Sequence, residues 1–219
     1  AAHKALSSVE AFAKATEGTA MSRFKVALHA SAIEFYFGQT FDLYAGKVPL
    51  VMMPDGTPVG LSSCEIKRVS DLAPFLDTVY ANRSTSGTAM NSGSSRGHAA
   101  LVLTLAECAE DPEKNKFYYV KRTLTLLDMA GSERPDKAGT QRYSVNEVSM
   151  MLMSGKTPSK KEQQGMEGLV INLELSALQT QFVQAGEANK TNRKFKNNGL
   201  RLPIVRYIGR CLTGQAWLT

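Results

Sequence analysis

Two short stretches of the sequence combine residue types that can bind phosphate and a metal ion. In the first, residues 123–127 (TLTLL) form an apolar run that leads directly into Asp128, Gly131 and Glu133. The apolar run predicts a strand covered on both faces, and ligands of α/β sheets bind at the carboxyl ends of such strands. Asp128 could therefore hold a metal ion or its water shell, Gly131 could offer a backbone N–H to a phosphate, and Glu133 could pair with a cation or a water. A strand followed by an ordinary polar turn is the alternative, because a motif this short also occurs by chance.

The second stretch is NSGSSRGH at residues 91–98. The hydroxyls of Ser94 and Ser95 can coordinate magnesium or bond phosphate oxygens, and the guanidinium of Arg96 can pair with a phosphate or a carboxylate. Taken alone, a loop rich in serine and glycine is more often simply a flexible connection. The stretch indicates a phosphate-binding role only when it is taken together with the aspartate-containing turn downstream.

The composition indicates one globular domain. The chain has 219 residues, of which 43% are hydrophobic and 21% charged, and no apolar run approaches the roughly 20 residues that a membrane helix needs. The amino-terminal stretch lacks the pattern of a secretory signal. Three widely separated cysteines favour a reducing compartment over a disulfide framework or a zinc site. A formal charge of +6 favours acidic partners without choosing among them.

Hydrophobic spacing predicts alternating strands and helices, hence an α/β layered domain. We expect helices at residues 1–16, 70–82 (capped by Ser70 or Asp71) and 168–185, with a last one after Pro203. We expect strands at residues 23–36, 41–44, 99–107 and 117–128. Residues 135–167 show no clear rhythm and predict a long loop with some helix, and the basic stretch 186–199 is not expected to fold alone.

The motif pair N-x-x-S-S-R-x-H and L-D-x-A-G-S-E-R resembles the two switch loops of the kinesin motor family, and the chain is identified as a member of that superfamily. ASAIEFYFGQTFDLY resembles a strand pair of the family, ANRSTSGTAMN the approach to switch I, and INLELSAL the start of the long microtubule-facing helix. RLPIVRYIGRCLTG is a weaker likeness of the loop and helix that follow. The resemblance covers nearly the whole chain in the family's order.

The resemblance implies a partial kinesin-like P-loop NTPase motor fold, with a mixed central sheet and helices on both faces. Residues 1–219 would form one partial motor domain that begins after the phosphate loop and ends before the last strand and helix. Its ligands would be ATP and Mg. The sequence departs from the family at Gly97, where a second serine is usual, and at Leu173-Glu174, where lysine and serine are usual. We expect these departures to weaken switching and to alter contacts with a track.

The resemblance also implies a role for each matching residue. Ser94 and Ser95 would touch the terminal phosphate and its magnesium, and Arg96 would form the ion pair with Glu133 that closes the two switches. Gly131 would sense the terminal phosphate through its N–H, and Asp128 would hold magnesium through water. The nucleotide-binding set is Asn91, Ser94, Ser95, Asp128 and Gly131, with Ser95 and Asp128 at the metal. In such sites catalysis is mainly the positioning of a water and the stabilisation of charge around a triphosphate.

No G-x-x-x-x-G-K-[ST] phosphate loop occurs in the sequence. GKT at residues 155–157 is rejected as one, because it lacks the upstream glycine and a preceding strand. Without the loop this chain alone is expected to bind ATP poorly and to be inactive. The chain is then either a fragment of an ATP-hydrolysing motor or a degenerate pseudo-motor that binds microtubules independently of nucleotide, and the missing initiator methionine favours a fragment. We also expect uncovered sheet edges and poor solubility.

A run of basic residues follows the long predicted helix: Lys190, Arg193, Lys194, Lys196 and Arg201. Its position matches the family's loop beside the track-binding helix, and the acidic tubulin surface would attract it. The alternatives are a solvated loop, or a nucleotide-dependent switch protein that binds nucleic acid through this segment; nucleic acid is the less favoured partner. The predicted partner is the microtubule and the predicted location the cytoplasm, on the cytoskeleton. The sequence makes no prediction of oligomeric state, direction of travel or cargo.

Overall fold

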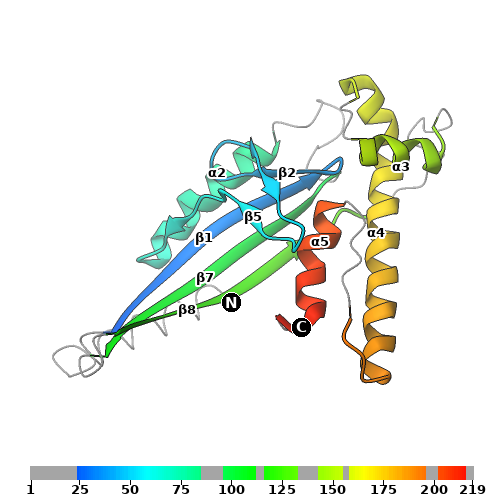
Figure 1. The fold of residues 1–219 in the computed structure, drawn as a ribbon. Coiled ribbons are helices and arrows are strands. Elements are labelled where there is room, and N and C mark those ends of the chain that lie inside the picture. The colour runs from blue at the N-terminus through cyan, green and yellow to red at the C-terminus, as the bar shows by residue number, and fades with distance from the viewer. Residues whose placement is uncertain are drawn as a thin grey trace.

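The computed structural model describes residues 24–84, 96–111, 116–132, 143–154, 158–195 and 202–215. Three long strands form the centre of the main sheet (Figure 1): β1 (Phe24–Tyr36), β7 (His98–Asp111) and β8 (Lys116–Asp128). The sheet order is β3-β2-β1-β7-β8, and β6 (Cys64–Glu65) also pairs with β1. The short strands are β2 (Gln39–Asp42) and β3 (Val48–Pro49). Every pairing among the described strands of this sheet is antiparallel, so the parallel pairs of the predicted mixed sheet are not seen there.

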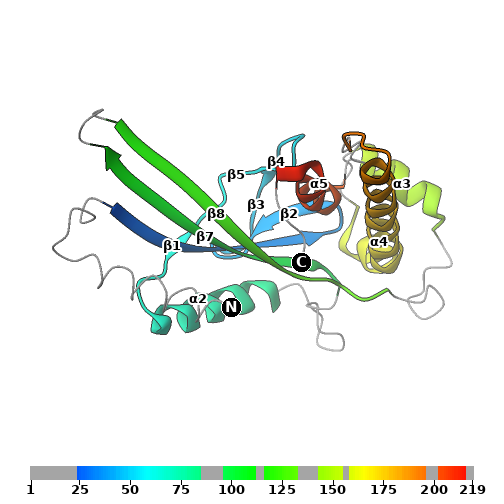
Figure 2. The same ribbon diagram turned by 90° about the horizontal axis from the view of Figure 1, so that it is seen from below.

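Different helices cover the two faces of this sheet, as predicted (Figure 2). Successive side chains of a strand point to opposite faces, so alternate residues of β1 and β7 belong to different cores. On one face Ile33, Phe35, Ala100 and Val102 pack against α4 (Lys160–Lys190) and α5 (Pro203–Arg210). On the other face Leu28, Ala30, Ala32 and Leu103 pack against α2 (Leu72–Ser84). The strand predicted at residues 23–36 is confirmed, and the structure shows in addition that it has a core on each side.

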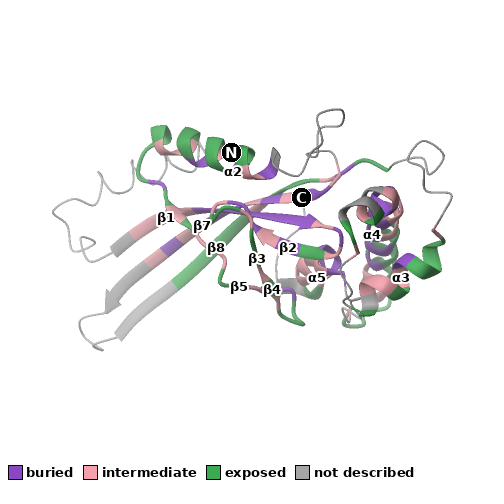
Figure 3. Cartoon of the chain, turned by 90° about the horizontal axis from the view of Figure 1, so that it is seen from above, coloured by how far each residue is buried: buried purple, intermediate pink, exposed green. Residues whose placement is uncertain are grey.

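The strand that leads into Asp128 is an edge strand, which corrects the prediction that it is buried on both faces. Among the described strands β8 pairs only with β7, and Leu124 and Leu126 are each 43% exposed. Figure 3 shows this exposed stretch of β8 beside the buried parts of β1 and β7. The apolar run could not reveal this, because periodicity reports apolar character and not whether a neighbour is present. Among the strands that the structure describes, the predicted uncovered sheet edge is seen at β8.

Two helices occupy much of the described part of residues 135–167, so the helix expected there is present and is more extensive than a long loop with some helix implied. α3 (Val145–Ser154) packs on the β1–β2 turn, where Phe37 and Val148 meet Met166 and Val170 of α4. α4 begins at Lys160, well before the predicted 168, because Ser159 and Glu162 form a reciprocal capping box. The sequence S-K-K-E carried that signal. α4 also continues to Lys190, into the stretch expected not to fold alone.

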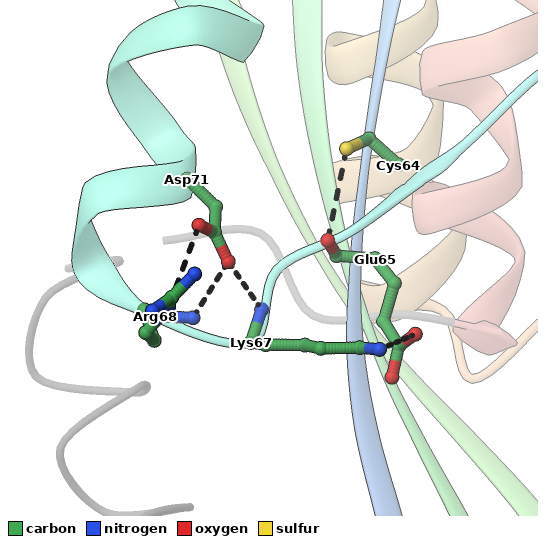
Figure 4. A network of polar contacts seen from close by, with 5 residues as sticks. All are labelled: Cys64, Glu65, Lys67, Arg68 and Asp71. Atoms are coloured by element: carbon green, nitrogen blue, oxygen red, sulfur yellow. Dashed lines mark hydrogen bonds and ion pairs between the residues drawn. The ribbon is translucent and has the colours of Figure 1, made fainter.

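The start of α2 is fixed by a carboxylate, but the N-cap is neither Ser70 nor Asp71 as predicted. Arg68 is the N-cap of the turn that leads into α2, and Asp71 is the third residue after it, whose side chain reaches back. The backbone N–H groups of Lys67 and Arg68 donate to Asp71 Oδ2 at 3.0 and 2.8 Å (Figure 4). These bonds hold the short 3₁₀ turn η2 (Val69–Asp71) from which α2 continues. Lys67 also pairs with Glu65 across 3.5 Å, which links the turn to β6.

α5 is held against a small hairpin by close backbone contact. β4 (Val51–Met52) and β5 (Pro58–Val59) form a two-stranded sheet whose turn contains Gly56. Gly56 has φ +85°, and a Cβ there would lie 2.3 Å from the carbonyl oxygen of Arg206 on α5. The turn therefore needs glycine both for its conformation and for this approach. α5 begins after Leu202 with Pro203, as predicted, and continues into the π-helical turn η6 (Cys211–Gln215).

Candidate functional site

The two chemistry-bearing stretches meet at one end of the sheet. β7 begins where β8 ends, with Ala99 opposite Asp128, and His98 lies opposite Phe35 near the end of β1. The last turn of α2 and the middle of α4 supply further side chains to the same end. The antiparallel register thus places residues 96–98 beside residues 128–131, although about 30 residues separate them in sequence.

Asp128 is held by an arginine that the sequence analysis did not identify. Arg83 Nη1 lies 2.6 Å from Asp128 Oδ2, and Arg83 Nη2 donates to the carbonyl oxygen of Gly97 at 3.2 Å. The arginine side chain is 10% exposed, whereas that of Asp128 is 69% exposed. One guanidinium therefore ties the end of β8 to the segment before β7. The available signal was a cation directly after the predicted helix at residues 70–82; in the structure it lies in the last turn of α2.

Gly97 lies under this arginine and against β1. It is buried, and a Cβ at this position would lie 3.2 Å from the carbonyl oxygen of Phe35. A serine, which the resemblance would put there, would therefore need its neighbour to give by a few tenths of an ångström. The effect of this departure on switching remains a prediction.

Arg96 has its partner on α4. Its guanidinium pairs with Glu167, and the hydroxyl of Tyr36 donates to the other oxygen of the same carboxylate at 2.5 Å. Burial, followed by the bond to Glu167, raises the pKa of the Tyr36 phenol above its ordinary value, so the phenol stays a donor. The predicted partner, Glu133, lies outside the described residues. Glu167 was not predicted from the sequence, because it is 71 positions from Arg96 and no motif connects the two residues.

His98 and Glu174 form a second connection to α4, in the interior. Their side chains are 0% and 2% exposed, and His98 Nε2 lies 3.3 Å from Glu174 Oε2. The other ring nitrogen, Nδ1, accepts a hydrogen bond from the backbone N–H of Ala130 at 3.0 Å. Ala130 directly precedes Gly131, so this imidazole lies between the long helix and the predicted phosphate-sensing turn.

Burial raises the pKa of the Glu174 carboxyl above its ordinary value, and the contact with His98 opposes that shift. The folded protein then binds this proton more tightly than the unfolded chain. The stabilisation is present at low pH and is lost as pH rises from the ordinary carboxyl pKa through the raised one. We therefore expect Glu174→Gln, which cannot ionise, to lose this pH-dependent step.

The measurement is urea denaturation of both proteins from about pH 4.5 to 8. The unfolding free energy of Glu174→Gln should gain on that of the original chain as pH rises. Glu187→Gln, at an exposed position of the same helix, is the control and should run parallel to the original. Parallel curves for Glu174→Gln would contradict the shift.

The described residues fit part of a magnesium site. Asp128 presents a largely exposed carboxylate at the carboxyl end of β8, which suits a metal held through water. Within the described ranges no three His, Cys, Asp or Glu side chains gather as a metal cluster. Gly131 is exposed, and a Cβ there would meet no atom of the described residues within 4 Å.

Several predicted site residues lie outside the described part of the chain. These are Asn91, Ser94, Ser95, Glu133, Lys196 and Arg201. Of the basic run, Lys190 ends α4, and Arg193 and Lys194 follow it; all three are exposed. The predicted helix at residues 1–16 is also outside the described part. No described helix is long and apolar enough to cross a membrane.

Comparisons with known proteins agree with this arrangement. The family model of the kinesin motor domain matches residues 5–200. The chain is 32% identical over 87 residues to kinesin-like protein KIF1B of Rattus norvegicus, a match that covers 40% of this chain and 5% of KIF1B.

Two solved structures share the fold. A KIF14 segment with ADP in complex with a microtubule matches with TM-score 0.66 and 21% identity, covering 98% of this chain and 55% of that one. The motor domain of the kinesin-like protein Kar3 of Saccharomyces cerevisiae matches with TM-score 0.58 and 21% identity, covering 96% of this chain and 57% of that one. The chain thus spans little more than half the length of these motor chains. The family model covers most of its residues, and the chain belongs to the kinesin motor domain family.

Proposed function

We propose that the chain is the switch-bearing and track-facing part of a kinesin motor domain, in which residues 96–98 and 128–131 respond to ATP and Mg²⁺ and α4 faces the microtubule. The supporting observation is a set of three polar links: Arg83 to Asp128, Arg96 to Glu167, and His98 to Glu174. The first joins the two switch-like segments, and the other two join residues 96–98 to α4. A change at either segment is thereby passed to the long helix.

Magnesium bound with ATP supplies charge neutralisation at the phosphates. Asp128 would hold the ion through water, while Arg83 keeps that carboxylate at the sheet end. Ser94 and Ser95 would supply hydroxyls to the phosphate and the metal, Asn91 would help bind the nucleotide, and Gly131 would donate its N–H to the terminal phosphate. Glu133 would be the second carboxylate available to Arg96. These 219 residues contain no G-x-x-x-x-G-K-[ST] loop, so under this proposal the phosphate-loop amides would be supplied by sequence outside them.

The test is microtubule cosedimentation of the complete native protein without nucleotide, with ADP and with a non-hydrolysable ATP analogue. We expect the affinity to differ at least tenfold between the ADP and analogue states. Equal affinity in all three would overturn the motor proposal. If the complete sequence also has no phosphate loop, that result would favour the pseudo-motor, a cytoskeletal binding module whose affinity for microtubules does not depend on nucleotide.

The basic end of α4 is proposed to contact the acidic microtubule surface. Lys190, Arg193 and Lys194 are exposed, and Lys196 and Arg201 would extend the same charge. Replacing the first three with alanine should weaken microtubule binding about tenfold at low salt, because three exposed charges at about 0.5 kcal/mol each sum to about 1.5 kcal/mol.

The control for this triple variant is Lys67→Ala, which removes one exposed cation beside α2. The gap between the two variants should shrink as salt is added, because screening removes long-range attraction. Equal binding by both variants would contradict the contact. If duplex DNA competes with microtubules for the protein and displaces them at the same salt concentration, the nucleic-acid alternative is favoured instead.

A further inference from the structure

The imidazole of His98 is enclosed between a backbone donor and a buried carboxylate. Nδ1 accepts the N–H of Ala130 at 3.0 Å, and Nε2 lies 3.3 Å from Glu174 Oε2. The first contact comes from the turn after β8 and the second from the middle of α4. Both side chains of the His98–Glu174 pair are almost fully buried, at 0% and 2% exposure, so water does not compete freely for either.

The hydrogen-bond chemistry of this arrangement selects one form of the ring. A nitrogen that accepts from an N–H must carry a lone pair, so the ring proton lies on Nε2, on the side that faces Glu174. A carboxyl oxygen there favours that tautomer and holds the ring plane. Without this carboxylate, Nε2–H would lose the buried acceptor that lies 3.3 Å away, and the opposite tautomer, which cannot accept from Ala130, would become competitive.

The charged side chains near the His98–Glu174 pair form ion pairs with other residues. Arg96 pairs with Glu167, and Arg83 spans Asp128 and Gly97. Glu174 Oε1 and His98 Nε2 are both buried without a hydrogen-bond partner of good geometry among the described residues, so the 3.3 Å between the ring and the carboxylate is an ion-pair distance and not a formed hydrogen bond. The position therefore holds polar groups at an energetic cost. The sequence here reads Leu173-Glu174 where the family usually has lysine and serine. This link therefore belongs to the chain's own residues and is not inherited from the general motif.

We propose that Glu174 is a positioning residue: through His98 it fixes the N–H of Ala130, so that a shift of α4 moves the turn containing Gly131. The consequence for nucleotide sensing rests on the proposed function, but the link itself does not. A helix displaced along its axis would draw the imidazole away from Ala130. The backbone in front of Gly131 would then lose its hydrogen bond to His98 Nδ1.

The link is tested by NMR on the chain, with ¹⁵N-labelled histidine and hydrogen exchange at the Ala130 amide. His3 and His29 provide internal references for the ring signals. We expect His98 in the Nε2–H form and a protected Ala130 amide. Glu174→Leu, which fills the space but removes the acceptor, should speed Ala130 exchange at least tenfold relative to the amides of β7. Glu174→Gln, which keeps an acceptor oxygen, should restore protection, and Glu187→Gln on the exposed face should change nothing.

A His98 ring in the Nδ1–H form, or Ala130 exchange that is unaffected by Glu174→Leu, would overturn the proposal. If Glu174→Leu does not fold, the tautomer in the original chain and the exchange rate in Glu174→Gln still decide it. In the complete protein, microtubule stimulation of ATP turnover should fall about tenfold in Glu174→Leu and recover in Glu174→Gln. If the microtubule affinity of the unmodified protein does not depend on nucleotide, only the motor proposal is contradicted. The tautomer of His98 and the exchange of the Ala130 amide are measured independently of that affinity.

Discussion

Arg96→Ala is expected to lower microtubule-stimulated ATP turnover of the complete protein by about a hundredfold. The substitution leaves Glu167, whose side chain is 6% exposed, with the Tyr36 hydroxyl but without its cation. Breaking a buried pair on one side costs about 3–5 kcal/mol, and the 23% exposure of Arg96 places this pair at or below the low end. The proposed function requires this pair in the microtubule-stimulated state, and a loss of about 2.7 kcal/mol in that state corresponds to a hundredfold in rate. Steady-state turnover against microtubule concentration is the measurement.

Arg122→Ala is the matched control for this prediction. Arg122 also pairs with a glutamate, Glu107, but its side chain is 66% exposed and it lies within β8, away from residues 96–98. Removing it should change turnover less than about twofold, since exposed pairs contribute little. Full stimulation in Arg96→Ala, or an equal loss in both variants, would contradict a specific role for Arg96.

Gly56→Ala is expected to lower the free energy of unfolding by about 2–4 kcal/mol. The added Cβ would lie 2.3 Å from the carbonyl oxygen of Arg206, so the hairpin turn or α5 must move. Such overpacking costs about 1–3 kcal/mol, and a left-handed conformation costs a non-glycine residue about 1 kcal/mol more. Because α5 belongs to the core that includes Phe35 and Val102, the shift reaches the sheet. Urea denaturation measures the loss.

Gly46→Ala separates the two causes. Gly46 has the same φ of +85°, but a Cβ there would meet nothing within 4 Å. It should therefore lose only the conformational part, about 1 kcal/mol. If Gly56→Ala and Gly46→Ala lower the free energy of unfolding by the same amount, the close approach of the hairpin to α5 does not contribute to the loss.

The strands and the ends of the sheet were predictable because their signals are local. Alternation in residues 23–36 and the run into Asp128 defined β1 and the end of β8, and the two motifs placed residues 96–98 beside residues 128–131. The exposure of Leu124 and Leu126 was not predictable, since the same apolar run suits a covered strand or an edge. The capping residues Ser159 and Glu162 indicate the early start of α4, but the irregular spacing of apolar residues after them gave no helical pattern to support it.

The partners within the site lay beyond what sequence spacing can show. Arg83 is 45 positions from Asp128, and Glu167 is 71 positions from Arg96. Charged residues are common on helices, and only the packing of α4 across the sheet end selects Glu167 and Glu174 as the ones that face inward. The motifs thus predicted which loops matter, whereas the links that join those loops to α4 required the tertiary fold.

The direct contact between residue 96 and α4 is tested most sharply by a double-mutant cycle on microtubule-stimulated ATP turnover of the complete protein. The cycle compares Arg96→Ala, Glu167→Gln and the double variant with the original. Transmission through this ion pair predicts that the double variant loses about as much turnover as either single variant, with a coupling energy of at least about 1 kcal/mol. Losses that simply add would contradict it, because the two residues would then act independently.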